Sequence, residues 1–313
     1  MDDIGTYLVT GALGCIGAWV TRLLLKDGAR VIAFDAGKAD HRLDAALIDV
    51  PVDRLARVSG DVSDPCQVNE ALTTHAVDAI IHLAALQVPA CASDPALGAR
   101  VNVVGHLVML EAARHTSGRP LVYASSVAAY DREPGGATSG PATFYGVYKR
   151  ACEQAAALYW QDFGVASVGL RPHTVYGPGR DAGLTSEPTR AILAAIAGEP
   201  FHLSFGGRLD MQYVEDVAQS FVNASRSHVA GAELVDLAGH TVSMSEIVTA
   251  IDAVIPGAMG GLTFDDVHLP FPTGLGHEPA PFPRARDRSL EDGIRATLEH
   301  QQVVRLRSPE HTR

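Results

Sequence analysis

A short apolar run that leads through closely spaced glycines into a helical pattern is the feature that most constrains the fold of this chain. Residues 7–10 are typical of a strand, glycines follow at positions 11, 14 and 17, and residues 18–26 have helical periodicity. Such glycines let the backbone approach a pyrophosphate, which the N-terminus of the helix stabilises. The pattern predicts a dinucleotide-binding turn made by Gly11, Gly14, Cys15, Ile16 and Gly17.

An acidic residue follows the next strand-like run. Residues 30–34 are apolar, and Asp35 comes directly after them, eighteen residues beyond Gly17. A carboxylate at this place accepts hydrogen bonds from the adenosine ribose and repels a 2′-phosphate. The sequence therefore predicts NAD rather than NADP as the cofactor, although the nearby Lys38 weakens that preference.

Strand-like and helical segments alternate along the rest of the chain. Further strands are expected at 57–59, 79–83, 120–124 and 165–170, and helices at 96–115 and 145–163. This alternation predicts an α/β, Rossmann-type, doubly wound parallel sheet with a smaller C-terminal substrate-binding region. We expect residues 1–175 to form the NAD-binding domain with the catalytic residues, and residues 176–313 to bind substrate and to return some segments to the sheet. Ligand contacts are expected where strands end, at Asp61, Val62, Leu83, Ala84, Ala85, Ser125 and Ser126.

A tyrosine and a lysine stand one helical turn apart, at positions 145 and 149. Lysine is rare here, with three lysines among 25 basic residues. Residues at i and i+4 share a helix face, so the Lys149 ammonium is expected to favour the ionised form of Tyr145. A free tyrosine titrates near ~10 and needs such help to exchange protons at neutral pH. The pair predicts an acid/base unit.

Composition excludes several other classes of protein. The chain has 313 residues, a formal net charge of −11 and a pI near 5.6, which argue against nucleic acid and anionic membranes as partners. No signal peptide or membrane span is apparent. The four cysteines are scattered without metal-site spacing, so we expect buried thiols, a cytoplasmic protein and no metal.

Taken in order, the motifs resemble those of the extended short-chain dehydrogenases/reductases, in the NAD-dependent epimerase/dehydratase family. They are Thr10-Gly11-x-x-Gly14-x-x-Gly17, Asp35, Asp61-Val62, His82-Leu83-Ala84-Ala85, Asn102-Val103-x-Gly105, Ser125-Ser126-x-x-x-Tyr130, Tyr145-x-x-x-Lys149, Arg171-Pro172-x-x-Val175-Tyr176-Gly177-Pro178 and Val214-Glu215-Asp216-Val217-Ala218.

The resemblance implies a role for several residues. Tyr145 would be the general acid/base, Lys149 would bind the nicotinamide ribose, and Ser126 would hydrogen-bond the reacting oxygen. Ser126 is preferred to Ser125 because it stands four residues before Tyr130, although Asp131 replaces the glycine that usually follows that tyrosine. Further cofactor contacts are expected from Asn102, Pro172, Thr174 and Val175. We also expect a homodimer.

Departures from the family pattern bear on the substrate. The Asp-Glu pair of the dehydratases is replaced by Val127-Ala128, which argues against elimination. Thr174 and Leu209 stand where epimerases of nucleotide sugars usually carry Asn and Arg, which suggests a substrate without a nucleotide. The candidate substrate residues are Ser126, Thr174, Arg180, Arg190 and Arg208; the arginines suit a carboxylate or phosphate, and surface positions are the alternative for Arg180 and Arg190.

Three functions remain open. A dehydrogenase would oxidise a secondary hydroxyl of a sugar, sugar acid or polyol and release NADH. A sugar or nucleotide-sugar epimerase would use the same residues but return the hydride to a transient keto intermediate. A redox sensor would bind NAD without catalysis. We favour the dehydrogenase, because the expected diphosphate contacts are missing.

The C-terminal region has fewer signals. Residues 177–207 are expected to form a lid with a helix at 189–197, followed by a return strand at 234–237 and a helix at 243–255. Residues 270–288 are expected to form an ordered surface loop. Ser289 and Asp292 predict the start of a last helix, and residues 305–313 are expected to fray.

Overall fold

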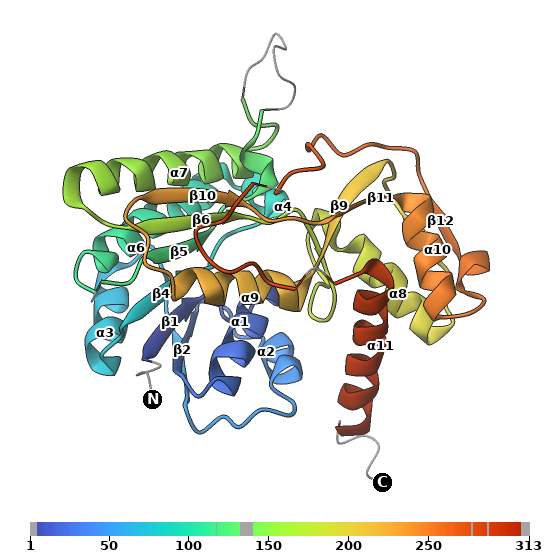
Figure 1. Ribbon diagram of the computed structural model, residues 1–313, viewed down its shortest axis with the longest axis horizontal. Helices are drawn as coiled ribbons and strands as arrows, with labels where there is room; N and C mark the ends of the chain where they lie inside the picture. The colour runs from blue at the N-terminus through green and yellow to red at the C-terminus, as the bar shows by residue number, and fades with distance from the viewer. Residues whose placement is uncertain (1–4, 117, 132–139, 277, 287, 308–313) are drawn as a thin grey trace.

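The computed structural model describes residues 5–116, 118–131, 140–276, 278–286 and 288–307. Its largest element is a seven-stranded sheet of order β10-β6-β5-β4-β1-β2-β3, in which every neighbouring pair is parallel. The strands are β1 (Thr6–Thr10), β2 (Arg30–Asp35), β3 (Leu55–Ser59), β4 (Ala79–His82), β5 (Leu121–Ala124), β6 (Ser167–Arg171) and β10 (Ala232–Asp236). Figure 1 shows this sheet between layers of helices.

Helices cover both faces of the large sheet because its strands are apolar on both sides. On one face, Val9 and Val31 join a core with α1 (Cys15–Lys26) and α9 (Val214–Ser225). On the other, Leu8 and Ile32 join a core with side chains of α3 (Pro65–His75), α6 (Gly105–Ala113) and α7 (Phe144–Phe163). The predicted doubly wound α/β fold is therefore confirmed.

Local sequence signals set the ends of the helices. The Asp64 carboxylate accepts hydrogen bonds from two backbone N–H groups at the start of α3, and Pro65 occupies its first turn. Thr143 caps α7 in the same way through Gly146 N, at 3.0 Å, and Gly164 ends that helix at φ +68°. The cap fixes the start of α7, and with it the positions of Tyr145 and Lys149.

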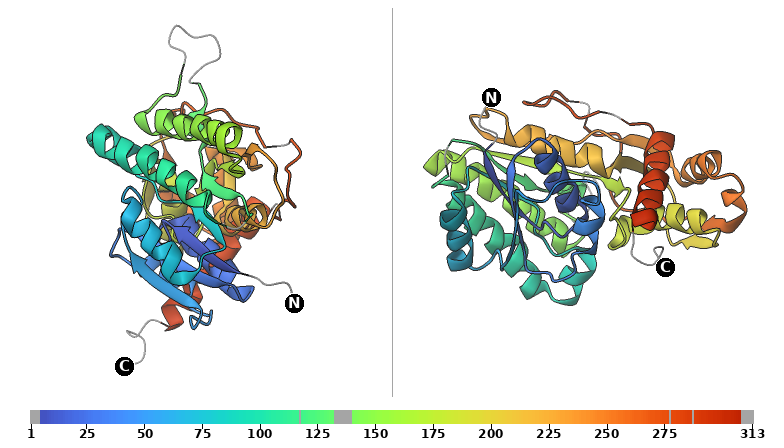
Figure 2. Two further views of the ribbon diagram at one scale, coloured as in Figure 1. Left: turned by 90° about the vertical axis from the view of Figure 1, so that its left-hand side faces the viewer. Right: turned by 90° about the horizontal axis from the view of Figure 1, so that it is seen from below.

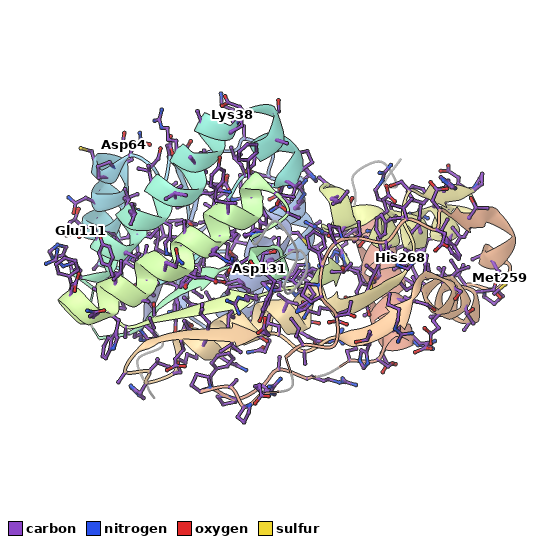
Figure 3. All side chains as sticks on the ribbon, turned by 90° about the horizontal axis from the view of Figure 1, so that it is seen from above. Lys38, Asp64, Glu111, Asp131, Met259 and His268 are labelled. Carbon is purple, nitrogen blue, oxygen red and sulfur yellow. The ribbon has the colours of Figure 1, made fainter. Side chains whose placement is uncertain are left out.

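The smaller part of the molecule has its own core. It holds the sheet β11-β9-β7 and the pair β12-β8, with residues of three helices packed between them. The elements are β7 (Thr174–Tyr176), α8 (Glu187–Ala197), β8 (Phe201–Leu203), β9 (Arg208–Tyr213), β11 (His240–Ser243), α10 (Met244–Val254), β12 (Leu262–Phe264) and α11 (Leu290–Arg307). Figures 2 and 3 show this part beside the large sheet, and Figure 3 labels Met259 and His268 on it. The division of the chain at residue 175 stays a prediction, and that position lies inside β7.

Most expected elements are present, with shifted ends. Two regions differ from the expectation. The expected helix at 96–115 is α5 (Pro95–Ala99), a π-helical turn η1 (Arg100–Val104) and α6, and α4 (Val88–Ser93) precedes it. Residues 305–307 were expected to fray but continue α11, whereas residues 308–313 lie outside the described residues. Short elements without a strong pattern, such as α2 (His41–Ala46), η2 (Val127–Ala129), η3 (Leu184–Ser186) and η4 (Ala258–Gly261), were not predicted.

One helical stretch meets the length and hydropathy criteria for a membrane span, which the sequence analysis did not anticipate. It covers Pro95–Ala113, and 39% of its most apolar 18-residue stretch is buried. Its Met109 and Leu110 are fully buried against the sheet. Leu97, Val104 and Leu107 of the same stretch are exposed at 45%, 45% and 36%, so packing in the fold accounts for only part of its apolar residues.

The four cysteines are only partly as expected. Cys91 and Cys152 are buried, but Cys66 is exposed at the start of α3 and Cys15 is partly exposed in the glycine turn. Both of these thiols stand at the start of a helix, Cys15 in α1 and Cys66 in α3.

Two stacked histidines, His82 at the end of β4 and His106 on α6, predict a pH dependence of stability. The rings of His82 and His106 lie 5.6 Å apart. Burial and the nearby Lys149 charge lower the pKa of His106 to about 3, and burial lowers that of His82 well below its usual value. Below pH ~6.5 the unfolded chain takes up protons that the native state does not. The free energy of unfolding therefore decreases as the pH is lowered, by about 1.4 kcal/mol per pH unit for each histidine.

His106→Phe keeps a ring and removes one of these titrations. Between pH 7.5 and 5, we expect the variant to lose about 2 kcal/mol less unfolding free energy than the wild type, measured by urea denaturation. The exposed His115 is a matched control, and His115→Phe should behave as the wild type. An equal loss in His106→Phe and the wild type would contradict the argument.

Candidate active site

A cavity of about 720 Å³ lies at the carboxyl ends of the central strands. It brings together almost all the residues that the sequence predicted for cofactor, catalysis and substrate. Those on its wall are Gly11, Gly14, Cys15, Ile16, Gly17, Asp35, Asp61, Val62, Leu83, Ala84, Ala85, Ser125, Ser126, Tyr145, Lys149, Pro172, Thr174, Val175, Arg180 and Arg208. Parallel strands end on one edge of the sheet, which is why residues so far apart in sequence meet here.

The glycine turn between β1 and α1 fits a pyrophosphate. Gly11 has φ +68°, and a Cβ there would lie 2.6 Å from Ala84 N. A Cβ on Gly17 would lie 2.1 Å from Gly11 O. Both positions therefore require glycine, and the close packing leaves the N-terminus of the twelve-residue helix α1 open towards the cavity.

Asp35 is held rigidly at the end of β2. Its carboxylate accepts hydrogen bonds from Leu13 N at 3.0 Å and Gly37 N at 2.8 Å. These bonds tie the glycine turn to the loop after β2. The carboxylate therefore lies on the cavity wall where an adenosine ribose would follow from the pyrophosphate. Lys38 is exposed nearby and is labelled at the edge of the large part in Figure 3.

This placement predicts the choice between the two dinucleotides. NAD should bind more tightly than NADP, and Asp35→Ala should reduce the ratio of their Kd values about tenfold by removing the repulsion of the 2′-phosphate. Fluorescence titration with NADH and NADPH measures both constants. Asp40→Ala is a matched control, because Asp40 lies in the same loop but pairs with Arg57 at 2.6 Å. Tighter binding of NADPH by the wild type would refute the role of Asp35.

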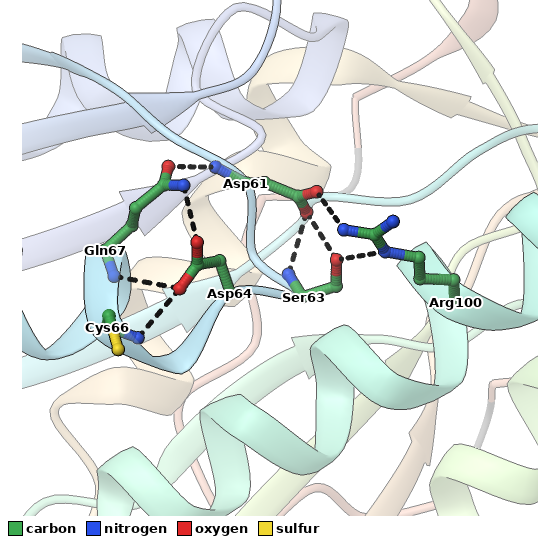
Figure 4. A network of polar contacts seen from close by, with 6 residues as sticks. All are labelled: Asp61, Ser63, Asp64, Cys66, Gln67 and Arg100. Atoms are coloured by element: carbon green, nitrogen blue, oxygen red, sulfur yellow. Dashed lines mark hydrogen bonds and ion pairs between the residues drawn. The ribbon is translucent and has the colours of Figure 1, made fainter.

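Asp61 belongs to a polar network at the end of β3, drawn in Figure 4. Its Oδ1 accepts hydrogen bonds from Ser63 N and Ser63 Oγ, both at 2.8 Å, and Arg100 Nη2 lies 3.4 Å from Oδ2. Arg100 also donates to Ser63 Oγ at 3.0 Å. The network orients the Asp61 carboxylate on the cavity wall, and its expected contact with the adenine amino group stays a prediction.

Tyr145 and Lys149 are buried together on α7. The Lys149 Nζ lies 5.5 Å from the centre of the Tyr145 ring and donates to Ala124 O at 2.5 Å. This bond anchors the ammonium at the end of β5. Both side chains line the cavity, so the positive charge is placed to stabilise a phenolate on Tyr145.

The two neighbouring serines point to different surroundings. Ser126 Oγ caps the short turn η2 by accepting from Ala128 N at 3.1 Å, whereas Ser125 Oγ donates to Glu153 Oε1 at 2.5 Å. The hydroxyl proton of Ser125 is thus donated to a buried carboxylate. The arrangement supports the preference for Ser126 as the serine that meets a reacting oxygen.

A buried ion pair connects Ser125 to β6 and β10 of the large sheet. Arg171 Nε and Nη2 donate to Glu153, both at 2.7 Å. Burial opposes the charged form of Arg171, but the hydrogen bonds to Glu153 raise its pKa. Arg171 also donates to Tyr130 Oη at 3.0 Å, which in turn donates to Asp236 Oδ2 at 2.8 Å. Tyr130, from the Ser-x-x-x-Tyr pattern, is therefore part of a structural network rather than the cavity wall.

Two expected site residues lie outside the set that lines the cavity. Asn102 is buried in η1, where its side chain accepts from Leu86 N at 2.7 Å and donates to Leu86 O at 3.0 Å. It supports the loop after β4 instead of facing a cofactor. Arg190 is exposed on α8 and lies over the Phe201 ring at 5.0 Å. The helical phase of α8 directs it to the surface, so we no longer assign it to the substrate.

Arg180 and Arg208 remain on the wall, but both have partners. Arg180 Nη2 donates to Thr185 Oγ1 at 3.0 Å. Arg208 Nη2 donates to Thr241 O at 2.7 Å, Nη1 lies 3.7 Å from Glu246, and 57% of the side chain is exposed. Asp131, which replaces the family's glycine, accepts from Arg150 at 2.6 Å.

Several wall residues were not predicted. Arg42 and Asp181, which both line the cavity, form a bidentate pair with distances of 2.6 to 3.2 Å. His173, Asp210 and the segment 269–273 also line it. His173 stands inside the motif that begins at Arg171, so its position was a usable signal. The segment 269–273 has no periodicity, and only tertiary contacts bring it to the site.

The sequence is similar to known enzymes over most of its length. A family model described as the NAD dependent epimerase/dehydratase family matches residues 7–237. A UDP-glucose 4-epimerase of Mycolicibacterium smegmatis is 31% identical over 313 residues, a match that covers 93% of this chain and 97% of that protein.

Solved structures give the same result for the fold. The UDP-glucose 4-epimerase of Thermus thermophilus, solved in complex with NAD, has a TM-score of 0.72 at 26% identity and covers 95% of this chain and 99% of its own. An L-threonine dehydrogenase of Clostridium difficile has a TM-score of 0.79 at 23% identity and covers 96% and 98%. At that identity the second likeness shows the fold alone.

Proposed function

The chain belongs to the NAD-dependent epimerase/dehydratase family, and we propose that it is a dehydrogenase that oxidises a secondary hydroxyl of a sugar, sugar acid or polyol. NAD is the cofactor of the family, and the glycine turn and Asp35 fit it. The choice of a substrate without a nucleotide rests on the contacts of Arg208. Its guanidinium already contacts Glu246 and Thr241 O. Leu209, which is buried, stands where epimerases of nucleotide sugars usually carry an arginine.

Three residues of the cavity have separate roles in the proposed oxidation. Ser126 orients the substrate hydroxyl by hydrogen bonding, and Tyr145 takes up its proton. The Lys149 ammonium, fixed by Ala124 O, stabilises the phenolate before this transfer and binds the nicotinamide ribose. NAD, when bound, supplies the acceptor for the hydride. Leu269, Phe271, Pro272 and Thr273 line the same cavity.

An epimerase is the second candidate. It is favoured by the relative from Mycolicibacterium smegmatis, which is a UDP-glucose 4-epimerase and matches almost the whole chain. The same serine, tyrosine and lysine serve both reactions. A sensor without catalysis is not favoured, because all three residues line one cavity.

The dehydrogenase and the epimerase differ in whether NADH accumulates. With NAD and a panel of galactitol, D-arabitol, D-galactose and D-gluconate, we expect absorbance at 340 nm to rise for at least one compound, in proportion to the product formed. UDP should not raise the Tm, because a ligand stabilises the native state only when it binds it. Stabilisation by UDP, or inversion of a hydroxyl of UDP-glucose without NADH release, would put the epimerase first.

We also propose a homodimer in the cytoplasm, without nucleic acid or membrane partners. Two neighbouring helices, α6 and α7, expose apolar side chains, including Leu107, Val147 and Leu158 at 36%, 47% and 56%. A patch of this kind is typical of a protein interface. Light scattering at micromolar concentration tests it, and a monomer mass would contradict it.

A further inference from the structure

Two polar side chains at the substrate end of the cavity face each other without a role in the chemistry described above. His173 lies between β6 and β7, and Asp210 lies in β9. Their Nδ1 and Oδ2 atoms are 3.3 Å apart, and the side chains are 3% and 0% exposed. Both residues line the cavity. A buried imidazole and carboxylate therefore form a dyad on the cavity wall.

The contacts of Asp210 determine which nitrogen of His173 carries the proton. Asp210 accepts from Thr241 Oγ1 at 2.5 Å and from Gly274 N at 2.8 Å. A carboxylate is an acceptor, so the His173 Nδ1 that faces it must donate. Burial lowers the pKa of His173 although Asp210 opposes this, so the ring is neutral. Nε2 is then left with a lone pair.

This Nε2 atom has no hydrogen-bond partner among the described residues, although it is buried. An unpaired buried polar atom costs about 1–3 kcal/mol, a cost that a bound ligand would remove. The cavity residues Pro172 and Thr174 flank His173 in sequence. The structure thus holds an unpaired acceptor at a fixed position directly behind the wall of the site.

The dyad and the catalytic tyrosine border the same end of the cavity. Gly274 N binds Asp210, and three residues earlier Phe271 packs against the cluster that contains Tyr145 and Ala128. Phe271 and Thr273 line the cavity as well. A small substrate next to Tyr145 is therefore close to the segment that Asp210 holds.

We infer that His173, oriented by Asp210, accepts a hydrogen bond from a second hydroxyl of the substrate and so selects a small polyhydroxylated compound. The inference rests on the proposed dehydrogenase function. A neutral acceptor backed by a carboxylate matches a hydroxyl donor, and it disfavours a phosphate or carboxylate at the same place because these groups offer no proton and carry like charge. His173 determines specificity, and Tyr145 performs the proton transfer.

The test compares the best substrate of the panel above with its monodeoxy analogues. The wild type should lose about tenfold or more in kcat/KM for one analogue, since its acceptor is then left unpaired. His173→Phe should raise KM for the parent about tenfold with little change in kcat, and should reduce that discrimination to about twofold. The Kd for NADH should stay within about twofold.

Two polar variants separate the nitrogen atoms. His173→Asn keeps a donor near Nδ1 and lacks a group at Nε2, so it should behave like the phenylalanine variant even if that one does not fold. His173→Gln places an amide near Nε2 and should restore part of the KM. The control is His202→Phe, since His202 is 55% exposed and outside the cavity wall; it should match the wild type.

Unchanged KM and unchanged discrimination in a folded His173→Asn or His173→Phe would overturn the inference and leave the dyad a structural role. If the wild type forms no NADH with any compound of the panel, the dehydrogenase proposal fails instead, and the substrate class inferred here fails with it. The two failures are distinguished by the activity of the wild type.

Discussion

Tyr145→Phe should reduce turnover about 10²–10⁴-fold, the range that positioned acid/base groups contribute. The change removes only the phenolic oxygen, so the Kd for NADH should stay within about twofold and the fold should be intact. Measured quantities are kcat by NADH absorbance with the best substrate of the panel and Kd by NADH fluorescence. Tyr148→Phe is the matched control, because Tyr148 lies on the same helix but donates to Pro95 O at 2.7 Å. It should keep near-normal kcat.

Lys149→Arg completes this experiment. The buried ammonium donates to Ala124 O at 2.5 Å, and the wider planar guanidinium cannot take the same place. We therefore expect a large loss of kcat in the arginine variant, although it keeps the positive charge. Near-normal activity of Tyr145→Phe would refute the acid/base role, and near-normal activity of Lys149→Arg would show that only the charge matters.

Glu153→Leu should lower the free energy of unfolding by about 3 kcal/mol, because the buried Arg171 guanidinium loses its bidentate partner and keeps only the longer contact with Asp236, at 3.6 Å. Ser125 Oγ loses its acceptor as well. The double variant Glu153→Leu with Arg171→Met should recover part of this loss, since it removes the buried guanidinium but also the contact of Arg171 with Asp236. Urea denaturation measures all three proteins.

An exposed ion pair provides the comparison. Arg57 pairs with Asp40 and Asp44 near the same sheet, with side chains 39% to 59% exposed. Arg57→Ala should cost under about 1 kcal/mol, as surface pairs usually do. A cost of Glu153→Leu as small as that of Arg57→Ala would mean that solvent reaches the buried pair and that the network does not support the fold.

The fold and the cofactor half of the site could be predicted from local sequence patterns. The glycines at 11 and 17 are needed because a Cβ at either would clash with the backbone, and steric demands of that kind are visible residue by residue. Asp35 follows its strand directly, and Tyr145 and Lys149 are one turn apart on a capped helix. Periodicity, capping and spacing are properties of adjacent residues, so the chain alone carries them.

Tertiary structure decided what depends on the direction of a side chain or on distant segments. Asn102 belongs to the family pattern, but burial under the loop after β4 turns it to Leu86, and the phase of α8 carries Arg190 to the surface. Conversely, His173 meets Asp210 only because β7 pairs with β9, 37 residues further on at Thr174 and Met211. By itself the sequence determined the sheet, the glycine turn and the tyrosine-lysine unit; packing between distant strands and loops determined the substrate end, since those contacts have no local signature.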